Sequence, residues 1–199
     1  MPESKADKTR GCLGTVYRVT AEFLTERKML EEVKARVSPD TRKLLEKAPF
    51  AFAWQESAPL EEIERILFAM PGGRKLCVDL GHAAGRQLSS SMIKPVLKMA
   101  ISLFGQTPGS LFANLDRFFS MVVRGFTFRY EERGPREGIV YAEIAGGGIH
   151  ESLFDQIRGN LLTVYDLCSV KGEVGEPQVV RRDDDGALVS LPVRWDLAA

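Results

Sequence analysis

The spacing of the apolar residues changes at one point in the chain, and this change limits the folds that the chain can adopt. Up to Gly125 the apolar side chains recur every three or four positions, which is the period of an α-helix. Directly afterwards Phe126, Phe128 and Tyr130 alternate with polar residues, which is the period of a half-buried strand. We therefore predict an α+β fold in which a helical half precedes an antiparallel sheet.

Prolines and glycines divide the helical half into separate helices. Ser38 and Thr107 each precede a proline, so each places a capping side chain before a residue that suits the first helical turn. The segment Pro71-Gly72-Gly73 ends the helix before it. The predicted helices span about residues 13–37, 38–48, 59–70, 76–88, 91–104 and 107–124.

The last third of the chain predicts two hairpins separated by one helix. The first hairpin turns at residues 133–138, and the second turns at Asp185-Gly186, a strong hairpin signal. The helix between them covers about residues 149–168. Pro192 lacks a backbone donor, so we expect its strand at a sheet edge. The result is a ββαββ unit, a four-stranded antiparallel sheet packed on helices.

Length and composition favour one domain. The chain has 199 residues, of which 44% are hydrophobic and 27% charged, so it can bury a substantial core. We expect a flexible leader over residues 1–10 and a single α+β domain over 11–196. Within the domain, residues 11–125 are mostly helical and residues 126–196 form the ββαββ unit.

Charge and hydropathy exclude several classes of partner. Lys plus Arg and Asp plus Glu number 27 each, so no net field attracts nucleic acid or an acidic membrane. No apolar run reaches the roughly 20 residues of a membrane span, and residues 1–10 lack the apolar region of a secretory signal. We therefore expect a cytoplasmic protein.

Aromatic side chains gather around the junction between the last helix of the helical half and the first strand. They either fill a core or line an apolar cavity, and the filled core is the commoner arrangement. His82 lies among apolar residues, and Cys168 ends the predicted stripe of the late helix, so both are candidates for the same pocket. The candidate pocket residues are Phe118, Phe119, Phe126, Phe128, Tyr130, His82 and Cys168.

Three consecutive glycines, Gly146, Gly147 and Gly148, separate the second strand of the unit from the late helix. Free N–H groups at a helix N-terminus can hold an anion, so this loop is a candidate anion site. The loop lacks the Lys-Ser/Thr of a phosphate-binding loop, and a simple reversing loop explains the glycines as well.

Motifs for metal binding and catalysis are missing from the sequence. Neither His82 nor His150 belongs to a metal-binding motif, and the cysteines at 12, 77 and 168 are too scattered to predict a disulfide. No nucleophile elbow occurs, and the acidic run 183–185 suits a hairpin tip. We predict no catalytic residue and no metal site.

The ββαββ unit resembles the vinyl-reductase-type domain, whose superfamily includes haem-nitric-oxide-binding domains and small subunits of vesicle-tethering complexes. The resemblance rests on Gly125, on the glycine loop and on the segment Tyr165 to Gly172 at the end of the late helix. Nearly the whole chain, residues 11–196, is similar to an uncharacterised paralogous family of myxobacteria. The helix start at Thr107 belongs to this wider similarity.

The resemblance brings two cofactors into consideration. Zinc-binding members have a second cysteine after a Cys-x-x-x-Gly stretch; Cys168 and Gly172 match, but Glu176 stands at the expected position. Haem-binding relatives have a proximal histidine and a Tyr-x-Ser-x-Arg clamp, and this clamp does not occur in the sequence. We therefore predict no cofactor, with both zinc and haem disfavoured.

The resemblance favours a non-enzymatic module of bacterial regulation that senses a ligand or contacts a protein, with an apolar pocket. The alternative is an enzyme acting on a small hydrophobic or tetrapyrrole-like substrate, for which Cys168, His82 and Glu143 are the candidate reactive groups. A further alternative is a pure interaction protein, such as a homodimer, that pairs through the edge strand containing Pro192.

Overall fold

The computed structural model describes residues 9–90, 94, 95 and 105–196. Residues 1–8 of the predicted leader lie outside the described residues. So does the predicted helix over residues 91–104, apart from residues 94 and 95. Every statement below about what the protein contains or lacks refers to the described part.

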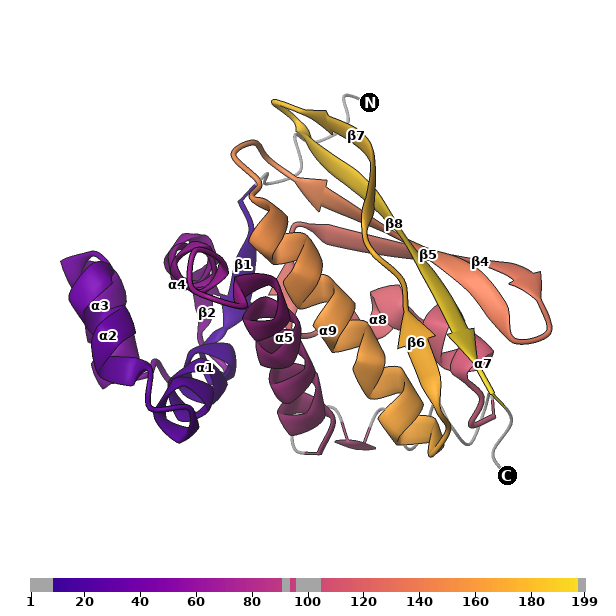
Figure 1. Ribbon diagram of the computed structural model, residues 1–199, viewed down its shortest axis with the longest axis horizontal. Coiled ribbons are helices and arrows are strands. Elements are labelled where there is room, and N and C mark those ends of the chain that lie inside the picture. Colours follow the sequence, from indigo (N-terminus) through magenta and orange to yellow (C-terminus); the bar gives the residue numbers. More distant parts are fainter. Residues whose placement is uncertain (1–8, 91–93, 96–104, 197–199) are drawn as a thin grey trace.

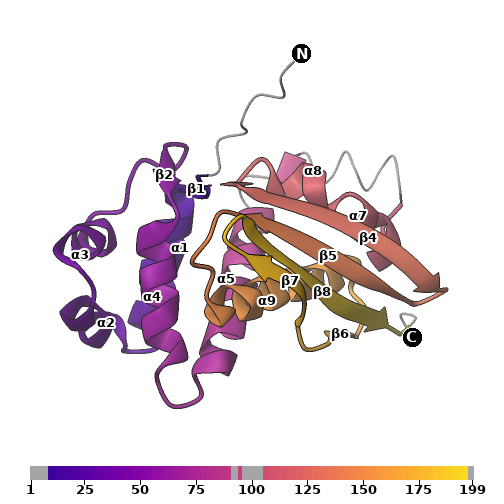
Figure 2. The same ribbon diagram turned by 90° about the horizontal axis from the view of Figure 1, so that it is seen from above.

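The elements form three groups along the long axis of the molecule (Figure 1). Four helices lie at one end: α1 (Gly14–Glu26), α2 (Leu30–Arg36), α3 (Pro39–Glu46) and α4 (Ala58–Phe68). Two longer helices run side by side in the middle: α5 (Gly73–Ser90) and α9 (Glu151–Cys168). An antiparallel sheet with α7 (Pro108–Ala113) and α8 (Leu115–Phe119) occupies the other end, and Figure 2 shows the same order from above.

The predicted α+β class is confirmed, although two predicted helices are divided. The helix expected over residues 13–37 breaks at Lys28, which adopts a left-handed conformation with φ of 58°. The backbone N–H of Lys28 bonds to Thr25 O and that of Met29 to Leu24 O, so the break closes the end of α1. Both parts keep their apolar side chains in one core, which explains why the period continued across the break.

The helix expected over residues 107–124 divides into α7 and α8 and then becomes a strand. Thr107 caps α7 as predicted, because its hydroxyl accepts the N–H of Ser110 at 3.2 Å. The chain beyond α8 is extended in β3 (Val123–Arg124), where Val123 pairs with Cys12 of β1 (Gly11–Leu13). β1 also pairs with β2 (Trp54–Glu56), which gives a small antiparallel sheet in the order β2-β1-β3.

The large antiparallel sheet has five strands in the described residues, where four were predicted. Its path is β4 (Phe126–Gly134), β5 (Glu137–Ala145), β8 (Gly186–Trp195) and β6 (Gly172–Val174), and β7 (Gln178–Asp183) also pairs with β8. The additional strand is β6, a segment too short to show a period.

Pro192 does not mark an edge strand, so the prediction of an edge at this strand is wrong. β8 is internal: Pro192 lies opposite Ile139 of β5, and β6 and β7 share the other side of β8. β6 reaches Val193 and β7 begins at Ser190, so the proline lies where one partner strand has ended and the next has not begun. The sheet therefore tolerates a missing donor there, and a homodimer through this strand has no free edge to use.

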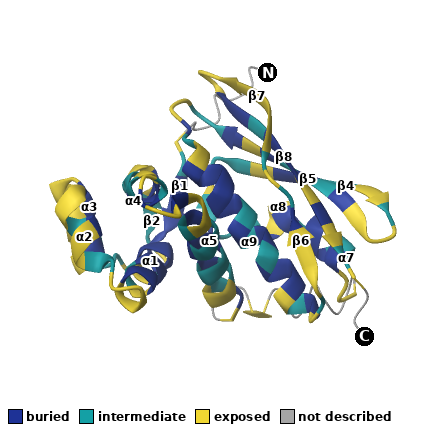
Figure 3. Ribbon diagram, in the orientation of Figure 1, coloured by how far each residue is buried: buried dark blue, intermediate teal, exposed yellow. Residues whose placement is uncertain are grey.

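One face of the large sheet is covered and the other is polar. Val140, Ala142 and Ile144 point to the covered face, and their partners on β4 and β8 join them in a core with α7, α8 and α9. The opposite face carries charged side chains such as Arg129 and Glu143. Figure 3 shows buried residues along α9 and mostly exposed residues on α2 and α3.

α5 and α9 touch through their backbones at two glycines. A Cβ atom at Gly81 would lie 2.0 Å from Gln156 O, and one at Gly159 would lie 1.9 Å from Val78 O. Side chains at either position would push the helices apart. Next to this contact, Arg74 of α5 binds the buried Asp155 of α9 through two N–O contacts of 3.0 and 3.2 Å.

Candidate functional site

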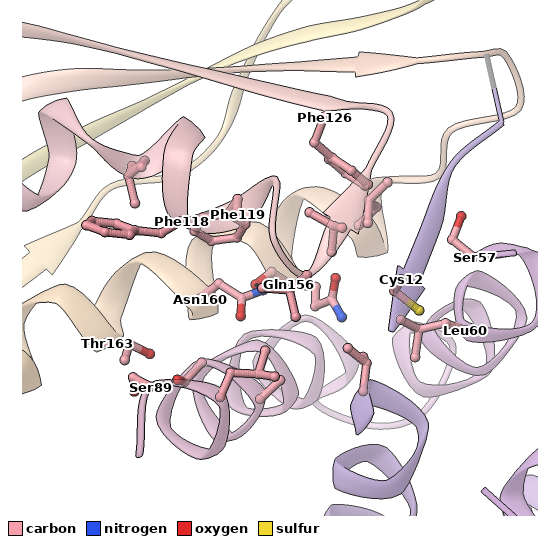
Figure 4. A pocket seen from close by; sticks show the side chains of 18 of the residues that line it. Cys12, Ser57, Leu60, Ser89, Phe118, Phe119, Phe126, Gln156, Asn160 and Thr163 are labelled. Carbon is pink, nitrogen blue, oxygen red and sulfur yellow. Dashed lines mark hydrogen bonds between the residues drawn. The ribbon is translucent and has the colours of Figure 1, made fainter. Parts of the chain in front are cut away.

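An internal cavity lies between the N-terminal helices, the α5–α9 pair and the start of β4. Figure 4 shows Phe118, Phe119 and Phe126 on one side of it and the polar groups of α9 across from them. The wall also includes parts of β1, α4, α5, α7 and β3, so it joins all three groups of elements. The described lining residues are Gly11, Cys12, Val16, Ser57, Leu60, Glu61, Glu64, Ala84, Gly85, Leu88, Ser89, Leu111, Leu115, Phe118, Phe119, Val122, Val123, Phe126, Leu153, Gln156, Asn160, Thr163, Val164 and Leu167.

The cavity is small and mostly apolar. Its volume is about 110 Å³, and most of the atoms in its wall are carbon. Apolar cavities of about 150 Å³ in proteins stay free of water and bind benzene or xenon. Pockets for drug-sized ligands are larger, roughly 300–1,000 Å³. The described conformation therefore has room for a very small ligand.

The aromatic side of the cavity is fixed by α8 and the strand that follows it. Asp116 of α8 accepts the backbone N–H of Phe128 at 2.9 Å, which ties the helix to β4. The ring of Phe119 lies 4.4 Å from that of Phe128, centroid to centroid, so Phe128 supports Phe119 from behind. The rings on this side are thus held by both helix and strand.

A buried ion pair closes the opposite side. Arg10 donates from Nε to Oε1 of Glu61 at 2.7 Å and from Nη2 to Oε2 at 2.8 Å, and Ser57 donates its hydroxyl to Oε1 at 2.7 Å. Burial alone would raise the pKa of Glu61, but these bonds and the charges of Arg10 and Arg65 outweigh it, so its pKa is lowered. Glu61 is therefore a carboxylate at neutral pH.

Glu64, one turn further along α4, has a different environment. Its side chain is completely buried, and neither carboxyl oxygen has a hydrogen-bond partner among the described residues. Burial raises the pKa of Glu64 well above its usual range, and the negative charge of Glu61 adds to this effect. Burial without a partner thus favours the neutral, protonated form of Glu64. Its neighbour Cys12 is also neutral, because burial and the nearby Glu64 raise the pKa of the thiol to about 12.

The structure brings three of the seven predicted pocket residues into the cavity wall, namely Phe118, Phe119 and Phe126. Phe128 lies behind Phe119, and Tyr130 stacks on Phe112 at a centroid distance of 5.7 Å. His82 and Cys168 also lie outside the wall.

These last two residues have partners or positions of their own. His82 Nε2 lies 2.7 Å from Asp166 Oδ2, in a contact between α5 and α9. Cys168 is buried in the core under the large sheet, and burial raises the pKa of its thiol to about 11. The other histidine, His150, caps α9 by accepting the N–H of Ser152 at 3.2 Å.

The glycine loop binds a cation of the protein itself. Arg10 Nη1 donates to the carbonyl oxygens of Ala145 at 2.7 Å and Gly146 at 3.1 Å, so these acceptors face a guanidinium group. The N–H of Gly146 is bonded to Asp185 O at 2.9 Å. Anion binding at Gly146–Gly148 stays a prediction, and these contacts do not favour it. Arg10 itself, which the sequence placed in a flexible leader, connects α4 to the sheet.

The polar part of the cavity was not predicted from the sequence, although one signal was present. Leu60, Ile63 and Leu67 form the apolar stripe of α4, and Glu64 lies on the same stripe, four residues after Leu60. A carboxylic acid on an apolar helix face is costly to bury without a partner, which marks it as unusual. Gln156 gave no comparable signal, because the buried residues of α9 include several other polar side chains.

Comparison with known proteins shows a shared fold. An H-NOX protein from K. algicida in its unliganded Fe(II) form matches with a TM-score of 0.68 and 10% identity, over 94% of this chain and 97% of that one. An oxygen-binding H-NOX domain related to soluble guanylate cyclases matches with a TM-score of 0.61 and 9% identity, over 92% and 94%. A structure from work on haem redox potential and protein-induced porphyrin distortion matches with a TM-score of 0.62 and 8% identity, over 92% of this chain and 99% of that one.

No family model matches the sequence, and no curated protein matches it. The similarity to haem-nitric-oxide-binding domains is thus supported by the fold, whereas the comparisons do not support the narrower myxobacterial family.

The fold comparison contradicts the expectation of no cofactor with haem disfavoured. That expectation rested on absent sequence motifs, whereas the structures that share this fold are haem proteins. Whether haem suits this chain depends on its own residues. The described wall of the cavity contains no imidazole, its thiol is protonated, and its volume is about 110 Å³. These residues do not fit a porphyrin in the described conformation.

Proposed function

We propose that this protein is a ligand-sensing domain built on the H-NOX fold, in which a small ligand occupies the internal apolar cavity. The observation that carries this proposal is the cavity itself, bounded by Phe118, Phe119 and Phe126 on one side and by α4, α5 and α9 on the others. Burial of apolar ligand surface in such a cavity is favourable without any covalent or metal bond.

The position of the cavity supports a sensing role. A ligand there would contact Leu60 on α4, Leu88 on α5 and Leu115 on α8, which belong to the three separate groups of elements. A ligand shifts a conformational equilibrium only if it contacts the two conformations differently. A ligand that contacts all three groups would lose or gain contacts if their arrangement changed, so its binding would depend on the conformation.

The proposed role is non-enzymatic. The enzyme alternative needs an acid, base or nucleophile in the pocket, and none of its candidates, Cys168, His82 and Glu143, lines the cavity. His82 is engaged with Asp166, and Glu143 lies on the polar face of the sheet, where its carboxylate pairs with Arg181 at 3.0 Å. The reactive groups that the sequence offered therefore lie in separate places, Cys168 in the core under the large sheet, His82 at the α5–α9 contact and Glu143 on the polar face of the sheet.

Methyl NMR during titration with xenon or benzene tests the proposal. We expect saturable shifts at the methyl groups of Leu60, Leu115 and Leu153, which line the cavity, and none at Leu45 or Val33 in the core near α2 and α3. A ligand that binds the folded state also raises the melting temperature, and the rise grows with the logarithm of the ligand concentration above its Kd.

Two neighbouring alanines of α5 offer a matched pair of variants. Ala84 lines the cavity, so Ala84→Leu fills it and should abolish the saturable shifts. Ala83 lies outside the cavity wall, so Ala83→Leu should leave binding unchanged. Equal shifts in both variants, or no saturation in the unmodified protein, would contradict the proposal. Hemin is a separate probe: a 1:1 complex lost in Ala84→Leu would replace the small-ligand cavity with a haem site.

A further inference from the structure

Two buried polar groups without partners face the same apolar cavity. Glu64 has two free carboxyl oxygens, and Thr163 of α9 has a free hydroxyl oxygen, among the described residues. Buried polar groups in folded proteins nearly always have a hydrogen-bond partner, and each exception calls for an explanation. A ligand that supplies the missing partners of the Glu64 carboxyl group would explain the first of these exceptions.

The charges around the cavity indicate which kind of ligand suits Glu64. Glu61 and Glu64 are three residues apart on α4, and both line the cavity. Arg10 and Arg65 both pair with Glu61, at 2.7 and 3.6 Å. No cation among the described residues pairs with Glu64. The cavity wall thus has a second carboxyl group with which no cation among the described residues forms an ion pair.

The remaining titratable groups near Glu64 are neutral at pH 7. Burial raises the pKa of Cys12 on β1, of Tyr17 on α1 and of Cys77 on α5. None of these groups can carry positive charge in any protonation state. The cation that would satisfy Glu64 must therefore come from outside the described residues.

We propose that the cavity binds a small primary amine with an apolar body, whose ammonium group binds the carboxyl oxygens of Glu64 while its hydrocarbon part contacts the aromatic side. This inference rests on the proposed function, because it names the class of ligand for the same cavity. An ammonium group has three N–H donors, enough to satisfy both oxygens of Glu64. The small volume limits the body to a few carbon atoms.

Binding of an amine changes the proton count in a defined way. The amine is an ammonium ion in water at pH 7, and the raised pKa of unliganded Glu64 favours a protonated carboxyl group. When the ion pair forms, Glu64 releases this proton to the solvent, and no other bond changes. Calorimetry in two buffers of different ionisation enthalpy should therefore record release of about one proton for each amine bound.

Isobutylamine and isobutanol are suitable probes, because they have the same shape and differ in charge. We expect isobutylamine to bind at least about tenfold more tightly than isobutanol, with proton release for the amine alone. Glu64→Gln should remove the preference and the proton release, while its methyl NMR spectrum stays that of a folded protein. Glu62→Gln is the control, because Glu62 is on the same helix but bonds to Ser38 and Thr41 outside the cavity.

The outcomes separate the two proposals. Saturable xenon binding with equal affinity for isobutylamine and isobutanol would overturn the amine inference and leave the cavity function standing. Amine binding that persists in Glu64→Gln would also overturn it. Absence of saturable binding by xenon, benzene and both isobutyl probes would overturn the proposed function itself. Loss of the amine preference in Glu64→Gln, with the methyl NMR spectrum of a folded protein, supports the inference.

Discussion

Replacement of Arg10 by methionine should destabilise the protein strongly, because this side chain joins α4 to the sheet. Methionine keeps much of the apolar stem but removes both N–O contacts to Glu61, at 2.7 and 2.8 Å, and the bonds to the carbonyls of Ala145 and Gly146. The Arg10 side chain is 11% exposed and that of Glu61 7%, so solvent screens the pair little. Removal of one partner of such a pair costs about 3–5 kcal/mol.

The lower end of this range applies to Arg10→Met. Glu61 keeps the hydroxyl of Ser57 at 2.7 Å and the guanidinium of Arg65 at 3.6 Å. We therefore expect a loss of about 3 kcal/mol at pH 7. Urea denaturation followed by circular dichroism measures it directly, provided that the slope of the transition stays unchanged. Arg65→Met is the matched control, because the Arg65 side chain is 49% exposed and its removal should cost less than about 1 kcal/mol.

The pH dependence of this loss provides a second measurement. In the unmodified protein Arg10 is the main group that lowers the pKa of Glu61, so the stabilisation is present above the unfolded pKa and is lost as pH falls through the folded pKa. Without Arg10, burial raises the pKa of Glu61, and the carboxyl group can protonate in the folded variant. The deficit should therefore be largest near pH 7 and shrink toward pH 4. A deficit below 1 kcal/mol, or one equal at both pH values, would refute the argument.

Three further changes test other parts of the structure. Gly159→Ala places a Cβ 1.9 Å from Val78 O between α5 and α9, and should cost at least about 2 kcal/mol in urea denaturation; a loss below 0.5 kcal/mol would contradict the backbone contact. Because the pKa of Glu64 is raised, the folded protein holds a proton that the unfolded chain releases, so the unmodified protein loses stability as pH rises. Glu64→Gln should therefore gain stability relative to the unmodified protein between about pH 5 and 8, by at most about 1.4 kcal/mol per pH unit. Parallel curves of unfolding free energy against pH would contradict this. Thr163→Val removes a buried hydroxyl without a partner among the described residues and should raise stability by about 1 kcal/mol, measured as a higher melting temperature.

The sequence predicted the elements whose apolar pattern is long and regular. The alternation that begins at Phe126 and the stripe of residues 149–168 correspond to β4 and α9. Each element buries one continuous face, so the spacing of its apolar residues shows which side chains are buried. The caps at Ser38 and Thr107 were equally informative, because each hydroxyl accepts a backbone N–H of its own helix.

Elements that depend on distant pairing were not predictable. β1 has three residues and pairs with Val123, more than a hundred positions away, so no local pattern marks either strand. The break at Lys28 has no glycine or proline to indicate it. The edge strand predicted from Pro192 was wrong for a related reason. The proline is tolerated inside the sheet because β6 has ended and β7 has not begun at its position, and this depends on distant pairing.

The candidate site was predictable only on its aromatic side. Phe118, Phe119 and Phe126 are neighbours in sequence, so their approach in space follows from the helix-to-strand junction. The opposite side needs Arg10, Glu61 and Glu64, whose roles depend on which of the two carboxylates the arginine reaches. A sequence shows the excess of acid on α4, but it does not show which group remains without a cation.

The glycine contact between α5 and α9 has a mechanical consequence. With backbone against backbone at Gly81 and Gly159, the two helices have no side-chain layer there that could compress, so the crossing is a fixed pivot. Ser90, nine residues from Gly81, lies about 13 Å along the helix, so a tilt of about 5° would displace it by roughly 1 Å. The cavity wall at Leu88 and Ser89 lies on this long arm. A ligand slightly too large for the cavity would thus produce its greatest movement at the C-terminal end of α5, far from the crossing.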